Sequence, residues 1–162
     1  MSDRSDTPGV IAPPPLIALA MVALGLAFDR LWPIDVLRDQ VGLAARVILG
    51  GALIGAGAAL VIVAKRTFRR IGTNTPPWKP ALRLATEGAY ARLRNPMYAG
   101  GMLLLFGIGV AFASVWMLAL LIPTALILHY GVVLREERYL EEKFGEDYRA
   151  FKAAVPRYGW RM

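Results

Sequence analysis

The longest uncharged run of the chain lies between Arg94 and Arg135 and holds 40 residues without aspartate, glutamate, lysine or arginine. A helix crosses the hydrocarbon core of a bilayer with about 20 residues, so this run is long enough for two crossings. Its midpoint, residues 113–116, reads Ala-Ser-Val-Trp and suits a short turn. We therefore predict that the run forms a tight helical hairpin inside a membrane.

Two further uncharged runs, residues 11–28 and 47–64, are each long enough for a single crossing. They predict spans at residues 15–28 and 43–64, and the first span is expected to be retained. A soluble bundle is disfavoured because a surface helix needs a polar face, which these runs lack. The predicted fold class is all-α: an integral membrane helical bundle of about four transmembrane helices. The last two form the tight hairpin, and a cytoplasmic amphipathic C-terminal helix follows.

The distribution of basic residues predicts the orientation in the membrane. Residues 65–94 carry eight basic side chains and one acidic side chain, whereas residues 29–40 carry two basic and three acidic ones. The positive-inside rule therefore places residues 65–94 in the cytoplasm, and four spans put both termini on the same side. Contacts with anionic membrane lipids account for the net charge of +7, so no nucleic-acid partner is expected.

The start of the predicted hairpin combines a helix start with charge and aromatic rings. Residues 92–98 read Arg-Leu-Arg-Asn-Pro-Met-Tyr, in which Asn95 is a good N-cap and Pro96 is tolerated in the first turn. The free N–H groups of such a helix start, beside two arginines, favour an anionic ligand group. The simpler interpretation is a capped helix whose arginine and tyrosine side chains anchor it at the membrane interface.

The end of the hairpin returns Glu136 and Glu137 to the membrane depth of Arg94 and Asn95. Adjacent glutamates on a helix usually face solvent, but their convergence with a basic helix start makes them a candidate site. A zwitterionic ligand would suit it, with its carboxylate at the helix start and its amine at the glutamates. His129, the single histidine, is either a hydrogen-bonded structural residue or a group that touches substrate. The absence of cysteine excludes thiolate nucleophiles and disulfides.

Packing is predicted at two further places. In the second span, Gly51 and Gly55 have the spacing that lets helix backbones approach closely, within the chain or in a dimer. After Arg135, one apolar helical face recurs and is broken at Gly145. Tyr158 and Trp160 lie between Arg157 and Arg161, as in an interfacial anchor. The residues of the apolar face are Leu140, Phe144, Tyr148, Phe151 and Val155.

Together, GAYARLRNPMY (residues 88–98) and EERYLEEKFGEDYRAFKAAVPR (residues 136–157) resemble a known superfamily of integral membrane methyltransferases. It contains isoprenylcysteine carboxyl methyltransferase and phospholipid N-methyltransferase. The upstream stretch FRRIGTNTPPWKPALRLATEGAY is also similar to bacterial members, and the resemblance covers about residues 65–158. Eukaryotic members typically have histidine at the position of Asn95, so RNPMY resembles the bacterial branch.

The resemblance implies S-adenosylmethionine as methyl donor. It also implies a cytoplasmic cofactor pocket formed by the last two spans and the C-terminal segment, and an acceptor that enters from the bilayer. Carried over residue by residue, the cofactor-binding residues are Tyr90, Arg94, Asn95, Pro96, Tyr98, Glu136 and Glu137. His129 is the predicted catalytic base where the acceptor is an amine or a thiol, whereas a carboxylate acceptor needs no base.

We therefore predict a membrane methyltransferase acting on a lipophilic or lipid acceptor, in the manner of isoprenylcysteine carboxyl methyltransferase. The alternative in the same class is a phospholipid N-methyltransferase. A small transporter or a non-enzymatic adaptor is the alternative of another class, although transporters usually bury an ionisable residue at mid-membrane.

The predicted organisation is a flexible N-terminal tail (1–14), two transmembrane helices (15–64) and a methyltransferase core with a cytoplasmic cofactor site (65–162). The predicted location is the bacterial cytoplasmic (inner) membrane. Neither the oligomeric state nor the identity of the acceptor follows from the sequence.

Overall fold

The computed structural model describes residues 6–159, and every regular element in this part of the chain is helical. The predicted all-α class is confirmed. In chain order the elements are α1 (Pro14–Leu31), α2 (Val36–Gln40), α3 (Leu43–Ile71), η1 (Gly88–Ala91), α4 (Pro96–Phe112), α5 (Val115–Leu128), the π-helical turn η2 (His129–Val133), α6 (Leu134–Phe144) and α7 (Glu146–Ala154).

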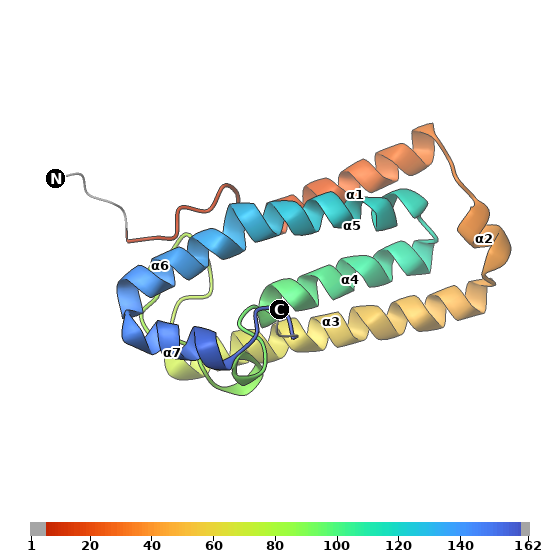
Figure 1. Cartoon of the computed structure of the whole chain (residues 1–162). Helices are drawn as coiled ribbons and strands as arrows, with labels where there is room; N and C mark the ends of the chain where they lie inside the picture. Colours follow the sequence, from red (N-terminus) through yellow and green to blue (C-terminus); the bar gives the residue numbers. More distant parts are fainter. Residues whose placement is uncertain (1–5, 160–162) are drawn as a thin grey trace.

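Four apolar helices form the bundle, with α1 beside α5 and α3 beside α4 (Figure 1). Of the described helices, α1, α3 and the continuous helix Val115–Phe144 are long and apolar enough to cross a membrane. At 17 residues α4 is shorter, but it lies within the range of about 17–25 residues that can span a bilayer. These helices agree with the predicted four-span bundle.

The predicted hairpin turn is confirmed between α4 and α5. Ala113 adopts a left-handed conformation with a φ of 52°, and it ends α4. The Ser114 hydroxyl then accepts a 3.0 Å hydrogen bond from the Met117 backbone N–H and caps α5. This cap satisfies one of the free N–H groups at the start of α5. Ala113 and Ser114 together thus reverse the chain within two residues.

The packing of α3 on α4 depends on glycines, but not on the predicted pair. A Cβ atom at Gly57 would lie 2.6 Å from the Gly100 carbonyl oxygen, and a Cβ at Gly50 would lie 2.8 Å from the Gly107 carbonyl oxygen. Gly51 and Gly55 have open space at the Cβ position. Close packing between these spans therefore uses positions 50 and 57, each facing a glycine of α4.

The connection 72–95, α6 and α7 gather at one end of the bundle, which we call the charged end (Figure 1). α3 runs beyond the predicted span to Ile71 and carries its last turns into this end. The apolar part of the continuous helix stops at Leu134, because α6 has seven charged residues. We therefore treat α6 as lying outside the membrane-spanning part.

The amphipathic C-terminal segment caps the charged end. Gly145 separates α6 from α7 with a φ of 54°, so the predicted break is confirmed. The predicted apolar face packs into one cluster with the end of α3 and with Ala85 and Tyr90. Within that cluster Tyr148 and Phe151 are buried. The predicted interfacial anchor includes Trp160, which lies outside the described residues.

The N-terminal residues before α1 lie along η2 and α6. The Ile11 backbone N–H donates a 3.2 Å hydrogen bond to the Gly131 carbonyl oxygen. Of the predicted flexible tail 1–14, Asp6, Gly9 and Ile11 therefore have hydrogen-bond partners in the structure, and Pro14 already belongs to α1.

Candidate active site

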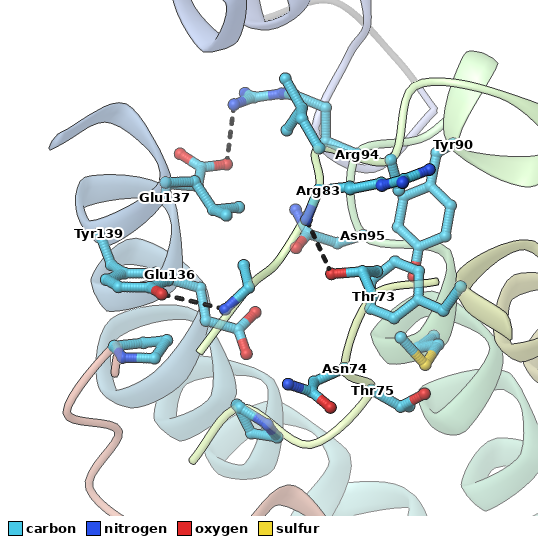
Figure 2. A pocket seen from close by; sticks show the side chains of 18 of the residues that line it. Thr73, Asn74, Thr75, Arg83, Tyr90, Arg94, Asn95, Glu136, Glu137 and Tyr139 are labelled. Carbon is cyan, nitrogen blue, oxygen red and sulfur yellow. Dashed lines mark hydrogen bonds and ion pairs between the residues drawn. The ribbon is translucent and has the colours of Figure 1, made fainter. Parts of the chain in front are cut away.

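A polar cavity of about 100 Å³ lies at the charged end, between α4, α6 and the 72–87 loop (Figure 2). It is lined by six of the eight site residues predicted from the sequence: Tyr90, Arg94, Asn95, Tyr98, Glu136 and Glu137. Pro96 is fully buried at the first position of α4 and does not line the cavity, among the residues described. The hairpin thus brings its two ends together as the sequence predicted.

Asn95 occupies the N-cap position of α4, but its side chain makes no capping hydrogen bond. The prediction of a side-chain cap is therefore wrong, although the helix does begin at Pro96. The Asn95 side chain is buried instead, and its amide nitrogen has no hydrogen-bond partner among the described residues. A buried amide donor without a partner is unfavourable, so this nitrogen is suited to a ligand acceptor.

Glu137 is held by two arginines. The Arg157 guanidinium donates two 2.8 Å hydrogen bonds, one to each carboxylate oxygen. Arg94 Nη1 lies 2.9 Å from Glu137 Oε1 (Figure 2), but the alignment is too poor for a hydrogen bond. Burial raises the pKa of Glu137, but the hydrogen bond from Arg157 and the charge of Arg94 outweigh it and hold the pKa below its ordinary value. Glu137 is therefore a carboxylate that positions arginines.

Glu136, the next residue, has a different environment. Its carboxylate Oε1 accepts a 2.6 Å hydrogen bond from the Tyr98 hydroxyl, and its exposed surface faces the cavity. Burial raises the pKa of Glu136 to about 7, the Tyr98 hydrogen bond acts in the opposite direction, and the charge of Glu137 adds a smaller increase. Among the described residues no basic side chain pairs with Glu136, so this carboxylate is available to a cationic ligand group.

Three groups at the cavity, Asn95 among them, have donor atoms without a hydrogen-bond partner in the described part of the chain. They are the Tyr90 hydroxyl, the Asn95 amide and the Nε and Nη1 of Arg94, although Nη1 is ion-paired with Glu137. Burial, and then the charge of Glu136, raise the pKa of Tyr90 above its ordinary value, so its hydroxyl stays protonated. These donors suit a carboxylate, and Glu136 suits an ammonium group. The cavity thus matches an amino-acid zwitterion.

An apolar cavity of about 420 Å³ adjoins the polar one. It lies between the apolar helices and is lined by residues of α1, α3, α4 and α5, including Ala18, Val61, Gly101, Met102, Leu105 and Leu128. Tyr98, Met97 and residues 75–77 line both cavities, so they form the common wall. Lys65 and Trp78 also line the apolar cavity, at the charged end of α3 and in the following loop.

Several site residues were not singled out from the sequence. Thr73, Asn74 and Thr75 line the polar cavity from the loop after α3, and Tyr139 lines it from α6. The uncharged polar run Thr-Asn-Thr before two prolines, in a strongly basic segment, is the signal that could have identified the loop. Arg157 was predicted to belong to an interfacial anchor, whereas in the structure it pairs with Glu137.

His129 lies in η2, outside both cavities. Its Nδ1 is 2.9 Å from the Tyr158 hydroxyl, and its ring meets the edge of Tyr130. Among the described residues, the lining of neither cavity includes His129. The geometry places the Tyr98–Glu136 pair, rather than His129, at the wall between the cavities.

Residues 45–147 match the sequence model of the phospholipid methyltransferase family. The chain belongs to the phospholipid methyltransferase family. The matched segment covers well over half of the chain and includes every candidate site residue named above from Tyr90 to Tyr139. Membership confirms the resemblance noted in the sequence and indicates a membrane methyltransferase. No curated protein and no solved structure matches the chain.

Proposed function

We propose that the protein is a membrane methyltransferase that transfers the methyl group of S-adenosylmethionine to a lipid acceptor. One observation carries this proposal: the polar cavity is lined by three groups with buried donors that lack a hydrogen-bond partner and by a carboxylate without a basic partner, and it shares a wall with an apolar cavity. Family membership supplies the reaction class. We further propose that the charged end faces the cytoplasm of a bacterial cell, in keeping with its excess of basic residues.

The residues of the polar cavity fit the amino-acid end of the donor. Tyr90, Arg94 and Asn95 would receive its carboxylate, because each has a buried donor without a partner in the described chain. Glu136 would receive its ammonium group. When bound, S-adenosylmethionine supplies an electrophilic methyl group. Glu137 contributes by orienting Arg94 and Arg157, and buried Pro96 sets the start of α4.

The apolar cavity would hold the acceptor. Its walls come from four apolar helices, so acyl or isoprenoid chains would enter without leaving an apolar environment. Lys65 lines this cavity, and its positive charge favours an acceptor with an anionic group in its headgroup, such as the phosphate of a phospholipid. We therefore propose a phospholipid amine as the acceptor, and an isoprenoid carboxylate in the manner of isoprenylcysteine carboxyl methyltransferase as the second candidate.

An amine acceptor must lose a proton, and the Tyr98–Glu136 pair lies at the common wall where that proton would be released. Glu136 would accept the proton, either directly or through the Tyr98 hydroxyl, which would pass its own proton on. Without the donor, the pKa of Glu136 is raised to about 7. The ammonium group of the bound donor would favour the ionised carboxylate at neutral pH, which is the form that accepts a proton. The catalytic role predicted for His129 is tested separately: turnover of a His129→Ala variant should remain close to that of the wild type.

The first test is calorimetric binding of S-adenosylhomocysteine to purified protein in lipid nanodiscs. We expect the wild type to bind, and Glu136→Gln to bind at least about tenfold more weakly, because a charge-assisted contact is lost. Glu142→Gln is the matched control, since Glu142 is exposed on the same helix and lines neither cavity. Failure of the folded wild type to bind would contradict the proposed donor.

The second test identifies the acceptor. The protein is reconstituted with S-adenosylmethionine and either phosphatidylethanolamine or an isoprenylated cysteine analogue, and the lipids are analysed by mass spectrometry. Methylated ethanolamine headgroups would support the phospholipid amine. Methyl esters formed only on the isoprenylated compound would replace it with the second candidate, and no product from either would contradict both acceptors.

A further inference from the structure

The described residues just before α1 form a strap across the end of the last membrane helix. We call residues 6–12 the N-terminal strap. The Ile11 N–H donates to the Gly131 carbonyl oxygen at 3.2 Å, and Arg135 Nη1 donates to the Gly9 carbonyl oxygen at 2.9 Å. Gly131 belongs to the π-helical turn, and such turns are frequent at functional sites. Two backbone groups of the strap are thus bound to the helix that carries Glu136.

At Gly131 the strap packs directly against η2. A Cβ atom at this position would lie 2.6 Å from Ile11 Cγ1, so a larger residue would push the strap away. Gly131 itself is buried. Because Gly131 has no side chain, the Ile11 side chain can pack directly against η2.

The other end of the strap is held by a polar contact at the cavity wall. Asp6 accepts hydrogen bonds from the Lys143 ammonium at 2.6 and 2.8 Å and from the Tyr139 hydroxyl at 2.8 Å. The same Tyr139 oxygen accepts a 3.0 Å hydrogen bond from the Ala81 backbone N–H. Tyr139 therefore joins three segments that surround the polar cavity: the strap, the 72–87 loop and α6.

The strap also forms part of the wall of the polar cavity. Pro8 lines the polar cavity together with Tyr139 and the loop residues 73–77. The cavity measures about 100 Å³, whereas pockets for small-molecule ligands measure about 300–1,000 Å³. Part of a ligand of that size, such as the amino-acid end of the donor, therefore fits inside this cavity beneath the wall to which Pro8 belongs. The strap wall is held to α6 by the ion pair between Lys143 and Asp6, in which the Asp6 side chain is exposed.

We propose that the N-terminal strap closes the polar cavity over the methyl donor, that the Asp6–Tyr139–Lys143 contact holds it shut, and that the strap opens for the donor to enter and leave. This proposal rests on the proposed function for the identity of the donor. Tyr139 and Asp6 are positioning residues in it, because they act on the donor through the strap.

A reversible cross-link tests the closure directly. An ideal Cβ at Gly131 lies 3.7 Å from the Ile11 Cβ, which matches the Cβ separation of about 3.5–4.5 Å in disulfides. The chain has no cysteine of its own, so Ile11→Cys with Gly131→Cys creates a single possible bond. We expect the oxidised protein to exchange S-adenosylhomocysteine at least about tenfold more slowly than the same protein after reduction. Equal exchange rates with the bond shown to be formed would overturn the proposal.

A second readout needs no donor. Ala85 is buried and lines the polar cavity, so a cysteine there reacts with a small thiol reagent only through the cavity. Reaction of Ala85→Cys should be slower in the cross-linked background than in the single variant. If neither form binds S-adenosylhomocysteine but the cross-link still slows this reaction, the closure stands and the proposed donor falls. Equal reaction rates would overturn the closure whatever the donor.

Substitution of Asp6, which holds the strap to α6, gives a third test that requires no cross-link. In Asp6→Asn we expect S-adenosylhomocysteine to dissociate about two- to fivefold faster, as for loss of an exposed ion pair, and in Asp6→Glu to dissociate nearly as in the wild type. Glu146→Gln removes another exposed pair, with Arg149, and should leave dissociation unchanged. If S-adenosylhomocysteine dissociated equally fast from Asp6→Asn and from the wild type, Asp6 would not hold the strap closed.

Discussion

The Tyr98 hydroxyl donates a 2.6 Å hydrogen bond to Glu136 and thereby links the first turn of α4 to the first turn of α6. Tyr98 lines both cavities, and Glu136 lines the polar one. The pair thus lies where a polar donor and an apolar acceptor would meet, and the first two predictions concern it.

Binding of S-adenosylhomocysteine should depend on pH through Glu136. The pKa of Glu136 is raised to about 7, so below pH 7 the protonated carboxyl cannot pair with the ligand ammonium. Calorimetry should show affinity falling by up to about tenfold per pH unit below pH 7, and a flat profile in Glu136→Gln. A wild-type profile as flat as that of the variant would contradict the role of Glu136.

The raised pKa of Glu136 affects stability in the opposite direction: ligand binding strengthens as the pH rises, whereas the free energy of unfolding falls. Between the ordinary pKa of glutamate and about 7, the folded protein holds a proton that the unfolded chain releases. The contribution of Glu136 to the free energy of unfolding is therefore largest at low pH and is lost as the pH rises towards 7.

The Tyr98→Phe variant removes the hydrogen bond that lowers the pKa of Glu136. We expect methyl transfer to an amine acceptor to fall by about tenfold or more, and the midpoint of the pH–rate profile to move to higher pH. Tyr130→Phe is the control, because Tyr130 is exposed. A lower rate with an unchanged midpoint would indicate a purely structural role for Tyr98.

The Arg157→Gln variant tests the double pairing of Glu137. The loss of two hydrogen bonds leaves Glu137 buried with Arg94 as its remaining ion-pair partner, and we expect a loss of about 1–3 kcal/mol in stability. Thermal unfolding in detergent measures this effect. Arg149→Gln, at an exposed pair on α7, should change the melting temperature little. Equal effects of the two variants would contradict the structural role of Glu137.

The glycine contact between α3 and α4 predicts a sharp difference between neighbouring positions. A Cβ at Gly57 meets backbone atoms of α4 at 2.6 and 2.7 Å, so Gly57→Ala should destabilise the protein by about 1–3 kcal/mol. Gly55→Ala adds a methyl group in open space and should be neutral within the chain. The comparison uses melting temperatures of dilute protein. A destabilised Gly55→Ala would instead place that face in a contact with a second copy.

The apolar cavity can be filled without a clash at Gly101. This glycine lines the cavity and has open space at its Cβ position, so Gly101→Leu should occupy acceptor volume while α4 stays packed. We expect methyl transfer to the lipid to fall and binding of S-adenosylhomocysteine to remain. Gly55→Leu is the matched control, since Gly55 is equally open and lies outside both cavities in the described chain. Unchanged transfer in Gly101→Leu would move the acceptor elsewhere.

The sequence predicted that the two ends of the hairpin meet, because the hairpin geometry follows from length alone. Forty uncharged residues and one tight turn must return Glu136 and Glu137 to the depth of Arg94, whatever the packing. The sequence could not separate the two glutamates, because adjacent helical residues point about 100° apart and the rotation of α6 decides which of them meets Arg157. The same holds for the glycines: Gly50 and Gly57 face α4, and Gly51 and Gly55 do not.

The sequence by itself determined that this chain is a helical membrane protein with one charged end, because hydropathy and charge are properties of each residue in turn. Only the tertiary structure decided that Glu136 faces a cavity while Glu137 binds two arginines, that Asn95 leaves its amide unpaired, and that the N-terminal strap reaches Tyr139. These features depend on helix rotation and on contacts between residues far apart in the chain, which no local pattern records.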